Sequence, residues 1–208
     1  MYTQYDEELV IGSKFSSEDP SSLTFLDIGA NDGVSYSNSR KLSIDGWSGV
    51  CLEPAPAAFG RLSDIYPEGD KVRIRNYGIS DSNGEKEFHD SGNWEGRNDT
   101  PPSILGTLDP GQKSRFYGMN WNVITCKFKT FEDFLEESEY KRFDFITIDV
   151  EGHDWVVLKQ MNLRELGCRM LCVEYNGNEA QLALFTGYCT SYGLEEIYRN
   201  TDNVIFSN

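Results

Sequence analysis

Long apolar runs and basic side chains are the two things this sequence most clearly lacks. No stretch of its 208 residues approaches the roughly 20 apolar residues that cross a bilayer, and the polar start has no signal-peptide core. Nineteen Lys and Arg stand against 34 Asp and Glu, a net charge of -15. Such a surface repels phosphate backbones. The basic residues of 71–75 alternate with apolar ones, as in a half-buried strand. We therefore expect neither a membrane nor a nucleic-acid partner.

Cysteine and histidine are also scarce. The five cysteines are an odd number and three lie in apolar, strand-like runs, which indicates reduced thiols and a cytoplasmic protein. Cys168 and Cys172 have no second ligand pair or nearby histidine to complete a zinc site, so we interpret them as buried thiols. The two histidines are His89 and His153.

The rest of the composition is that of a globular α/β domain. The chain has no repeat or low-complexity linker, so we expect a single domain over 1–208, with 1–22 as an edge segment that holds a helix near 5–15. Apolar runs predict strands at 23–28, 49–52, 72–79, 143–148 and 170–173, and helices at 35–44, 55–65, 130–137, 154–161 and 179–192. Residues 194–206 indicate a terminal antiparallel hairpin. The alternation predicts a Rossmann-like, mostly parallel twisted sheet with helices on both faces.

Ligands of such sheets bind beyond the carboxyl ends of the strands, and the first of these ends carries Asp27-Ile-Gly-Ala-Asn-Asp-Gly33. Gly29 and Gly33 allow a sharp turn. A dinucleotide fingerprint has a third glycine where this chain has Asn31, and acids bracket the loop. A cationic ligand such as S-adenosylmethionine, which carries a sulfonium and an ammonium, suits this loop better than a pyrophosphate. Glu53 ends the second strand and is placed to accept hydrogen bonds from both ribose hydroxyls.

Four segments together resemble the FkbM-type methyltransferases over about residues 4–173: 27–33, Leu52-Glu-Pro54, Asn76-Tyr-Gly-Ile-Ser80 and Ile148-Asp-Val-Glu-Gly152. The resemblance implies a class I methyltransferase fold and S-adenosylmethionine-dependent O-methylation of a saccharide or small metabolite. It further implies cofactor contacts from the following residues: Asp27, Gly29, Asn31, Gly33, Glu53, Ser80 and Asp81. Asp149 would lie near the transferred methyl group. The family often has lysine where this chain has Thr147, so any role of that lysine is absent here or is taken by another residue.

The catalytic candidates follow the fourth and fifth strands. An alcohol acceptor must lose a proton, and we expect His153 to act as the base, with the neighbouring acids raising its pKa. A helix-terminal histidine without a role is the alternative. Asp149 and Glu151, with Glu174 and Asn176 from the next strand end, are oxygen ligands that suit Mg²⁺. In a simpler interpretation, Glu174 and Asn176 bind substrate hydroxyls.

Residues 89–122 are rich in Gly, Asn, Pro and aromatics, which predicts an irregular substrate lid or insertion. Ser103 matches a serine common in the corresponding region of the family and is a substrate-binding candidate. A surface loop whose aromatics pack on the sheet is the competing interpretation. Two other functions stay open: a non-catalytic, degenerate S-adenosylmethionine-binding module, and a nicotinamide-dependent oxidoreductase, which Asn31 and the adjacent acids disfavour.

Overall fold

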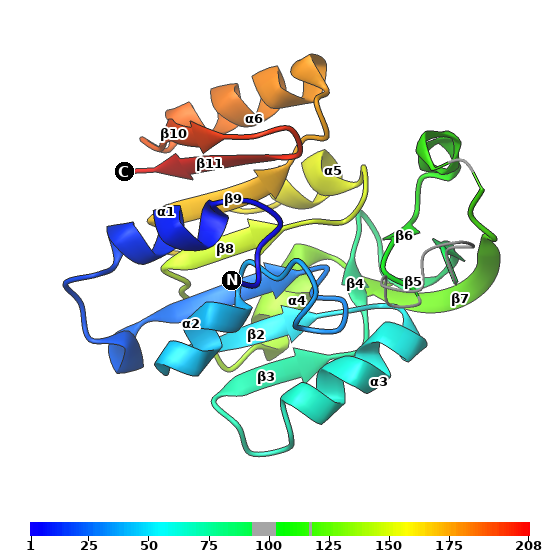
Figure 1. Cartoon of the computed structure of the whole chain (residues 1–208), viewed down its shortest axis with the longest axis horizontal. Helices are drawn as coiled ribbons and strands as arrows, with labels where there is room; N and C mark the ends of the chain where they lie inside the picture. The colour runs from blue at the N-terminus through cyan, green and yellow to red at the C-terminus, as the bar shows by residue number, and fades with distance from the viewer. Residues whose placement is uncertain (93–102, 117) are drawn as a thin grey trace.

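A seven-stranded sheet forms the centre of the molecule. The computed structural model describes residues 1–92, 103–116 and 118–208. The strand order is β10-β11-β9-β8-β1-β2-β3 (Figure 1). Five strands are parallel: β1 (Thr24–Ile28), β2 (Ser48–Leu52), β3 (Val72–Arg75), β8 (Phe145–Ile148) and β9 (Met170–Glu174). The hairpin of β10 (Glu195–Arg199) and β11 (Asn203–Ser207) joins β9 antiparallel. The predicted fold class is confirmed, and strand order reverses between β1 and β8.

Helices cover both faces of this sheet because its strands alternate their side chains between two cores (Figure 1). Leu26 and Ile28 of β1 face one core, where they pack with α4 (Phe131–Glu137), α5 (Asp154–Leu158) and α6 (Glu179–Ser191). Phe25 faces the other core, where it packs with α1 (Glu7–Lys14), α2 (Arg40–Asp45) and α3 (Pro56–Ile65). A short 3-10 helix, η1 (Pro20–Ser22), precedes β1. Consequently, Asp27 and Thr147 point to the α1–α3 side.

A second, four-stranded sheet lies beyond the carboxyl ends of the parallel strands (Figure 1). Its order is β4 (Gly78–Ile79), β7 (Asn122–Lys129), β5 (Gly84–Asp90) and β6 (Gly106–Thr107), and η2 (Pro110–Arg115) follows β6. The prediction of an irregular 89–122 is wrong at both ends, since β5 and β7 pair from Gly84↔Phe128 to Asp90↔Asn122. The exposed, charged start of β5 hid its strand pattern, whereas residues 124–129 of β7 do alternate between apolar and polar. Part of the predicted lid lies outside the described residues, including Asn93, Trp94, Pro101, Pro102 and Tyr117.

The predicted third strand, 72–79, is in fact two strands in two sheets. Asn76 turns the chain between them by donating its side-chain amide to the carbonyls of Glu53 (2.9 Å) and Pro54 (3.2 Å). Gly78 then passes so close to the Phe128 ring that a Cβ would lie 2.5 Å from it. The second sheet therefore draws β4 away from β3.

The predicted helix 35–44 begins only at Arg40. Its first residues use their side chains in other hydrogen bonds: Ser35 donates to Asp32 (2.9 Å), Ser39 donates to Asp27 (2.5 Å), and Ser37 accepts from the backbone of Arg40 (3.0 Å). Such bonds compete with helix formation. The shortened helix leaves a polar loop beside the end of β1.

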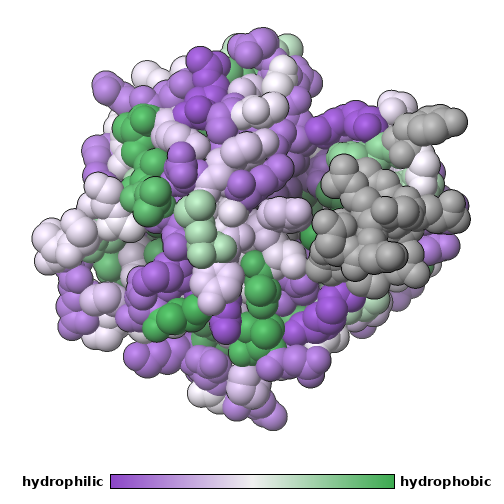
Figure 2. All heavy atoms as spheres, in the orientation of Figure 1, coloured by the Kyte–Doolittle hydropathy of each residue, from purple (hydrophilic) through white to green (hydrophobic). Residues whose placement is uncertain are grey.

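The helix predicted at 130–137 is confirmed as α4, and so are the buried thiols. Thr130 caps α4 by accepting a hydrogen bond from the backbone of Asp133 (3.2 Å). All five cysteines are free and buried. No helix in the described part of the chain is long and apolar enough to cross a membrane, and the face in Figure 2 is mostly hydrophilic with small apolar patches. The single domain over 1–208 stays a prediction.

Candidate active site

A cavity of about 330 Å³ lies where the strand order reverses, between the carboxyl ends of the central strands and the second sheet. This is the position that the fold predicts for a ligand. Ten of the predicted site residues line it: Asp27, Gly29, Asn31, Glu53, Ser103, Asp149, Glu151, His153, Glu174 and Asn176. The structure thus brings together residues from positions 27 to 176 of the chain.

The turn after β1 follows the neighbouring strand closely. Gly29 has φ +93°, and a Cβ there would lie 1.8 Å from the Asp149 carbonyl oxygen, so only glycine fits between β1 and the loop after β8. Asn31 donates its backbone N–H to Glu53 Oε2 (2.9 Å) and its side-chain amide to the Ile104 carbonyl (2.8 Å). This turn therefore connects β2 to the second sheet.

Backbone strain is concentrated around the cavity. Five described residues other than glycine have positive φ: Asn31, Tyr36, Ser103, Glu151 and Asn176. All five line the cavity. Positive φ is unfavourable for residues with a Cβ, and structures retain it where surrounding contacts hold a functional geometry. The strain supports a functional role for this cavity.

Two buried carboxyls, Asp27 and Glu53, stand at the ends of β1 and β2. Glu53 accepts backbone hydrogen bonds from Ala55 (2.7 Å, Oε1) and Asn31. Burial raises the pKa of Glu53 to about 7, although these two bonds counteract it. Burial likewise raises the pKa of Asp27 to about 7, against the hydrogen bond from Ser39. A cationic ligand beside them would favour their charged forms.

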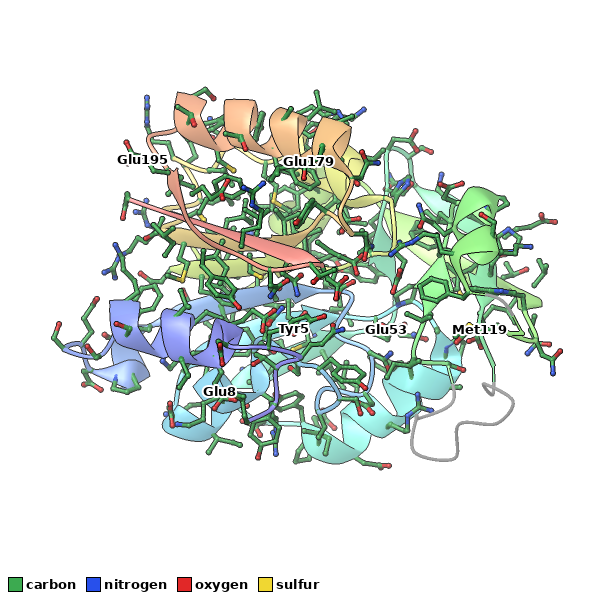
Figure 3. All side chains as sticks on the ribbon, turned by 45° about the horizontal axis from the view of Figure 1, so that its top comes forward. Tyr5, Glu8, Glu53, Met119, Glu179 and Glu195 are labelled. Atoms are coloured by element: carbon green, nitrogen blue, oxygen red, sulfur yellow. The ribbon has the colours of Figure 1, made fainter. Side chains whose placement is uncertain are left out.

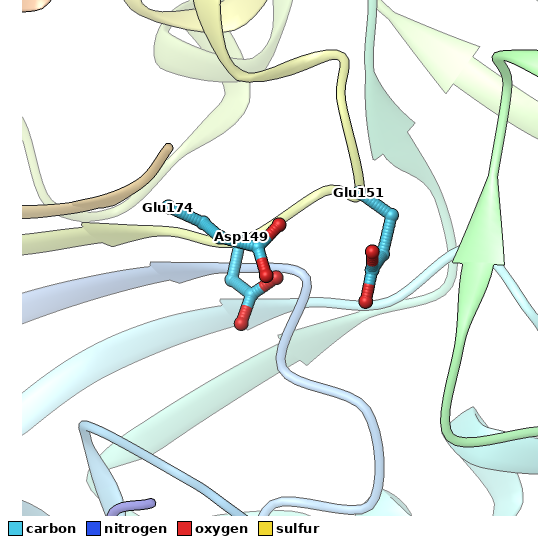
Figure 4. Close-up of side chains that lie close together, drawn as sticks. All are labelled: Asp149, Glu151 and Glu174. Atoms are coloured by element: carbon cyan, nitrogen blue, oxygen red, sulfur yellow. The ribbon is translucent and has the colours of Figure 1, made fainter. Parts of the chain in front are cut away.

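Three more carboxylates form a cluster after β8 and β9. Asp149, Glu151 and Glu174 each offer an oxygen within 4.8 Å of the others (Figure 4). Oε2 of Glu151 and Oε2 of Glu174 are buried and have no hydrogen-bond partner in the described structure. Arg115 approaches Glu151 to 3.9 Å. Burial is the largest cause of the raised pKa of each acid, about 6 for Asp149.

His153 lies directly before α5, and the prediction of its raised pKa is wrong. Burial lowers the pKa of His153, and this outweighs the charge of Asp81. Its Nε2 lies 3.2 Å from the Ser80 hydroxyl. Asp154 faces away from the cavity, where its carboxylate accepts the backbone N–H groups of Val150 (3.1 Å) and Gly152 (2.9 Å) and so holds the loop after β8. The imidazole is therefore held neutral and oriented at the cavity wall.

Three predicted cofactor residues do not line the cavity. Gly33 packs on α3, where a Cβ would lie 2.6 Å from Leu62 Cδ1. Ser80 is buried and faces His153, and Asp81 is exposed. Gly33 serves the strand-to-helix packing, and Ser80 positions the histidine.

Several wall residues were not predicted from the sequence. Gln4, Arg115 and Asp202 line the cavity, as do Phe88 and Phe128 of the second sheet. Gln4 lies in the early segment similar to the family, and Asp202 lies in a hairpin turn that the topology places beside β9. No local pattern indicated Arg115, which lies in η2. The two phenylalanines lie on β5 and β7, which were not predicted, although the alternation of residues 124–129 could have indicated β7.

The wall is rich in carboxyl groups and poor in basic side chains. Among the described lining residues the acids are Asp27, Glu53, Asp149, Glu151, Glu174 and Asp202, and the one Lys or Arg is Arg115. This acid-rich wall disfavours a phosphate-bearing ligand. It favours a cationic ligand, which would stabilise the charged form of the carboxyls, or a hydroxyl-rich one.

Comparison with known proteins agrees with this geometry. A family model described as Methyltransferase FkbM domain matches residues 27–193. The chain is 27% identical over 158 residues to the 2-O-methyltransferase NoeI of Sinorhizobium fredii. The matched region covers 74% of this chain and 63% of NoeI. It is also similar to a methyltransferase FkbM from Methylobacillus flagellatus KT (TM-score 0.60, 14% identity, 100% of this chain and 48% of that one).

A putative RNA methyltransferase from Pyrococcus horikoshii is similar at TM-score 0.52 and 12% identity, over 98% of this chain and 83% of that one. At such identities the solved structures show the fold alone. The chain spans less than two thirds of the length of the NoeI and Methylobacillus proteins.

Proposed function

Because the chain belongs to the FkbM family of S-adenosylmethionine-dependent methyltransferases, we propose that it methylates a hydroxyl of a saccharide or a similar small polyhydroxylated metabolite. The observation that carries the proposal is the acidic cavity at the reversal of strand order, with Glu53 at the end of β2 and no phosphate cradle in its described wall. The name of the NoeI relative, a 2-O-methyltransferase, supports a hydroxyl acceptor.

Glu53 is the residue we assign to the ribose. Each of its carboxylate oxygens already accepts one backbone N–H and can accept a further bond from a ribose hydroxyl. Asp27 and the Gly29–Asn31 turn would contact the methionine part of the cofactor, where the Asp27 carboxylate suits the ammonium group. The side chains that offer an apolar wall for the adenine ring are those of Ile79, Phe88 and Phe128. The bound cofactor supplies the methyl group as an electrophile on its sulfonium.

The acceptor would lie at the other end, beside Asp149, Glu174 and Asn176. Oε2 of Glu174 has no hydrogen-bond partner in the described structure, so it can accept a bond from a sugar hydroxyl. We assign His153 as the proton acceptor, because it lines the cavity in a neutral form with its ring held by Ser80. The acidic wall and the net charge of -15 disfavour a nucleic-acid acceptor.

The acidic cluster also fits a divalent cation, and we propose that Asp149, Glu151 and Glu174 hold Mg²⁺. The two oxygens without hydrogen-bond partners supply free lone pairs, and carboxylates are preferred Mg²⁺ ligands. The ion would act as a Lewis acid on the acceptor hydroxyl. Calorimetry with MgCl₂ tests this: we expect binding that Glu174→Gln abolishes and the exposed Glu85→Gln leaves intact. No binding by the wild type overturns the ion alone.

Calorimetry with S-adenosylmethionine, S-adenosylhomocysteine and NAD tests the cofactor. We expect the first two to bind and NAD not to bind. Glu53→Ala should weaken S-adenosylhomocysteine binding about tenfold to a hundredfold, since hydrogen bonds to a charged group are lost, whereas the exposed Glu85→Ala should not. Absence of binding to the wild type refutes the proposal. Binding without transfer to any saccharide or metabolite of a panel would instead favour a cofactor-binding module.

We also place the protein in the cytoplasm, on the state of its thiols. All five cysteines are buried and unpaired, which a reducing compartment maintains.

A further inference from the structure

The loop between β1 and α2 holds a side-chain amide whose oxygen has no partner. Asn38 lines the cavity, and only 9% of its surface is exposed. Its Nδ2 donates to Thr147 Oγ1 (3.2 Å) and to Cys172 Sγ (3.7 Å). Its Oδ1 is buried and has no hydrogen-bond partner in the described structure. Burial without a donor is costly for such an atom, and a ligand that brings a donor to this oxygen would remove the cost.

The neighbours of Asn38 place it on the α1–α3 side of the central sheet. Asp27 on β1 is paired with Thr147 on β8, which in turn is paired with Cys172 on β9. Because paired residues of neighbouring strands point to the same face, these three side chains form one row. Asn38 contacts two members of the row, and the next residue, Ser39, donates its hydroxyl to Asp27 Oδ2 (2.5 Å). Asn38 therefore lies next to the buried carboxyl of Asp27.

The strand order shows which part of the cofactor lies near Asn38. The order β9-β8-β1-β2 puts the contacts of Asn38, on β8 and β9, and the carboxyl of Glu53, after β2, on opposite sides of β1. Figure 3 shows Glu53 at the end of the central sheet that faces the second sheet. With the ribose at Glu53 and the methionine part at Asp27, Asn38 lies on the side of Asp27 away from the ribose. The amino-acid end of the cofactor is then the part within its reach.

The hydrogen bonds of the amide decide which group of the ligand it can bind. Both N–H groups of Asn38 are used by Thr147 and Cys172, so its free atom is an acceptor. The amino-acid end of S-adenosylmethionine carries an ammonium group, which donates up to three hydrogen bonds, and a carboxylate, which only accepts them. The ammonium is therefore the group that fits. Asp27 would supply the opposite charge, and Asn38 a neutral acceptor beside it.

We propose that Asn38 is a further binding residue for S-adenosylmethionine, and that its Oδ1 accepts a hydrogen bond from the ammonium group. Thr147 and Cys172 hold the amide so that this oxygen is left for the ligand. The inference rests on the proposed function, since it takes the cofactor as the ligand. The ammonium is the same in the cofactor and in its product, so Asn38 contributes to the binding of both and not to the methyl transfer step.

Calorimetry with three ligands tests this contact: S-adenosylhomocysteine, its desamino analogue, which lacks the ammonium, and its decarboxy analogue, which lacks the carboxylate. Asn38→Leu keeps the approximate shape of the side chain and removes the acceptor. We expect it to weaken binding of S-adenosylhomocysteine and of the decarboxy analogue about tenfold to a hundredfold, since a hydrogen bond to a charged group is lost. Binding of the desamino analogue should not change. The exposed Asn162→Leu, outside the cavity, is the matched control and should leave all three affinities intact.

The ratio of the affinities for S-adenosylhomocysteine and the desamino analogue separates the contact from damage to the fold. Equal weakening of all three ligands by Asn38→Leu overturns the proposal, because the variant would then have changed the shape of the cavity. Weakening of only the two ligands that carry a carboxylate also overturns it, since the amide would then act as a donor.

Asn38→Asp is the second variant, because it keeps an acceptor oxygen at this position. We expect it to retain the wild-type affinity ratio, and loss of the ratio in both variants overturns the proposal. If the wild type binds no S-adenosylhomocysteine, the proposed function and this contact both fail. A wild type that binds, with the same affinity ratio in Asn38→Leu, shows failure of the contact alone.

Discussion

The pH dependence of stability should expose the buried carboxyl of Glu53. In the ligand-free protein its pKa rises from 4.5 to about 7, with burial as the main cause. An acid with a higher pKa in the folded state binds more protons folded than unfolded, so the free energy of unfolding falls as pH rises from 4.5 to about 7. At about 1.4 kcal/mol per pH unit, the share of Glu53 is about 3 kcal/mol.

Glu53→Gln removes this titration while keeping the shape. The amide has one acceptor oxygen for the two N–H groups of Ala55 and Asn31, so we expect a loss of about 1–3 kcal/mol at pH 5. At pH 8 the wild type also carries the cost of a buried charge. The wild type's advantage over the variant should therefore shrink by about 3 kcal/mol between pH 5 and pH 8, and the variant becomes as stable as the wild type or more so.

Urea unfolding at pH 5, 6, 7 and 8 measures this difference, with Glu85→Gln on exposed β5 as the control. Asp27 and Asp154, each with a pKa of about 7, keep part of the slope in both proteins. An equal gap between the wild type and Glu53→Gln at pH 5 and pH 8 would refute the reasoning, because Glu53 would then titrate as an ordinary exposed acid.

Three further changes probe other features. Gly29→Ala places a Cβ 1.8 Å from the Asp149 carbonyl oxygen, so the free energy of unfolding measured in urea should fall by several kcal/mol. Gly12→Ala in α1, with open space around it, should instead raise that free energy by about 0.5–1 kcal/mol. Similar effects of the two substitutions would contradict the close approach at Gly29. Asn178→Ala removes the N-cap of α6 and should lower the unfolding free energy by about 1 kcal/mol, and an unchanged value would argue against the cap. Once an acceptor is found, His153→Gln should lower kcat about 10²- to 10⁴-fold with little change in KM. An unchanged kcat would show that His153 is not the proton acceptor.

Local patterns in the sequence determined the central sheet and much of the cofactor half of the site. Buried parallel strands are apolar throughout, so β1, β8 and β9 stand out from the polar turns around them. The glycine turn after β1 and the acid at the end of β2 are short-range features, and topology alone brings parallel strand ends to one edge. For this reason Gly29 and Glu53 could be placed at the cavity from sequence.

Only the tertiary structure decided the other walls and the electrostatics. The pairing of β5 with β7 joins segments more than 30 residues apart. The exposed, charged start of β5 gives no strand periodicity, although residues 124–129 of β7 alternate between apolar and polar. Asp202 and Gln4 meet across 198 residues through one exposed hydrogen bond of a kind that no local pattern encodes. The pKa of His153 depends on how deeply the ring is buried, and burial outweighed the neighbouring charges from which sequence reasoning started. Local chemistry selects the strands and turns, whereas burial and long-range contacts select what faces the ligand.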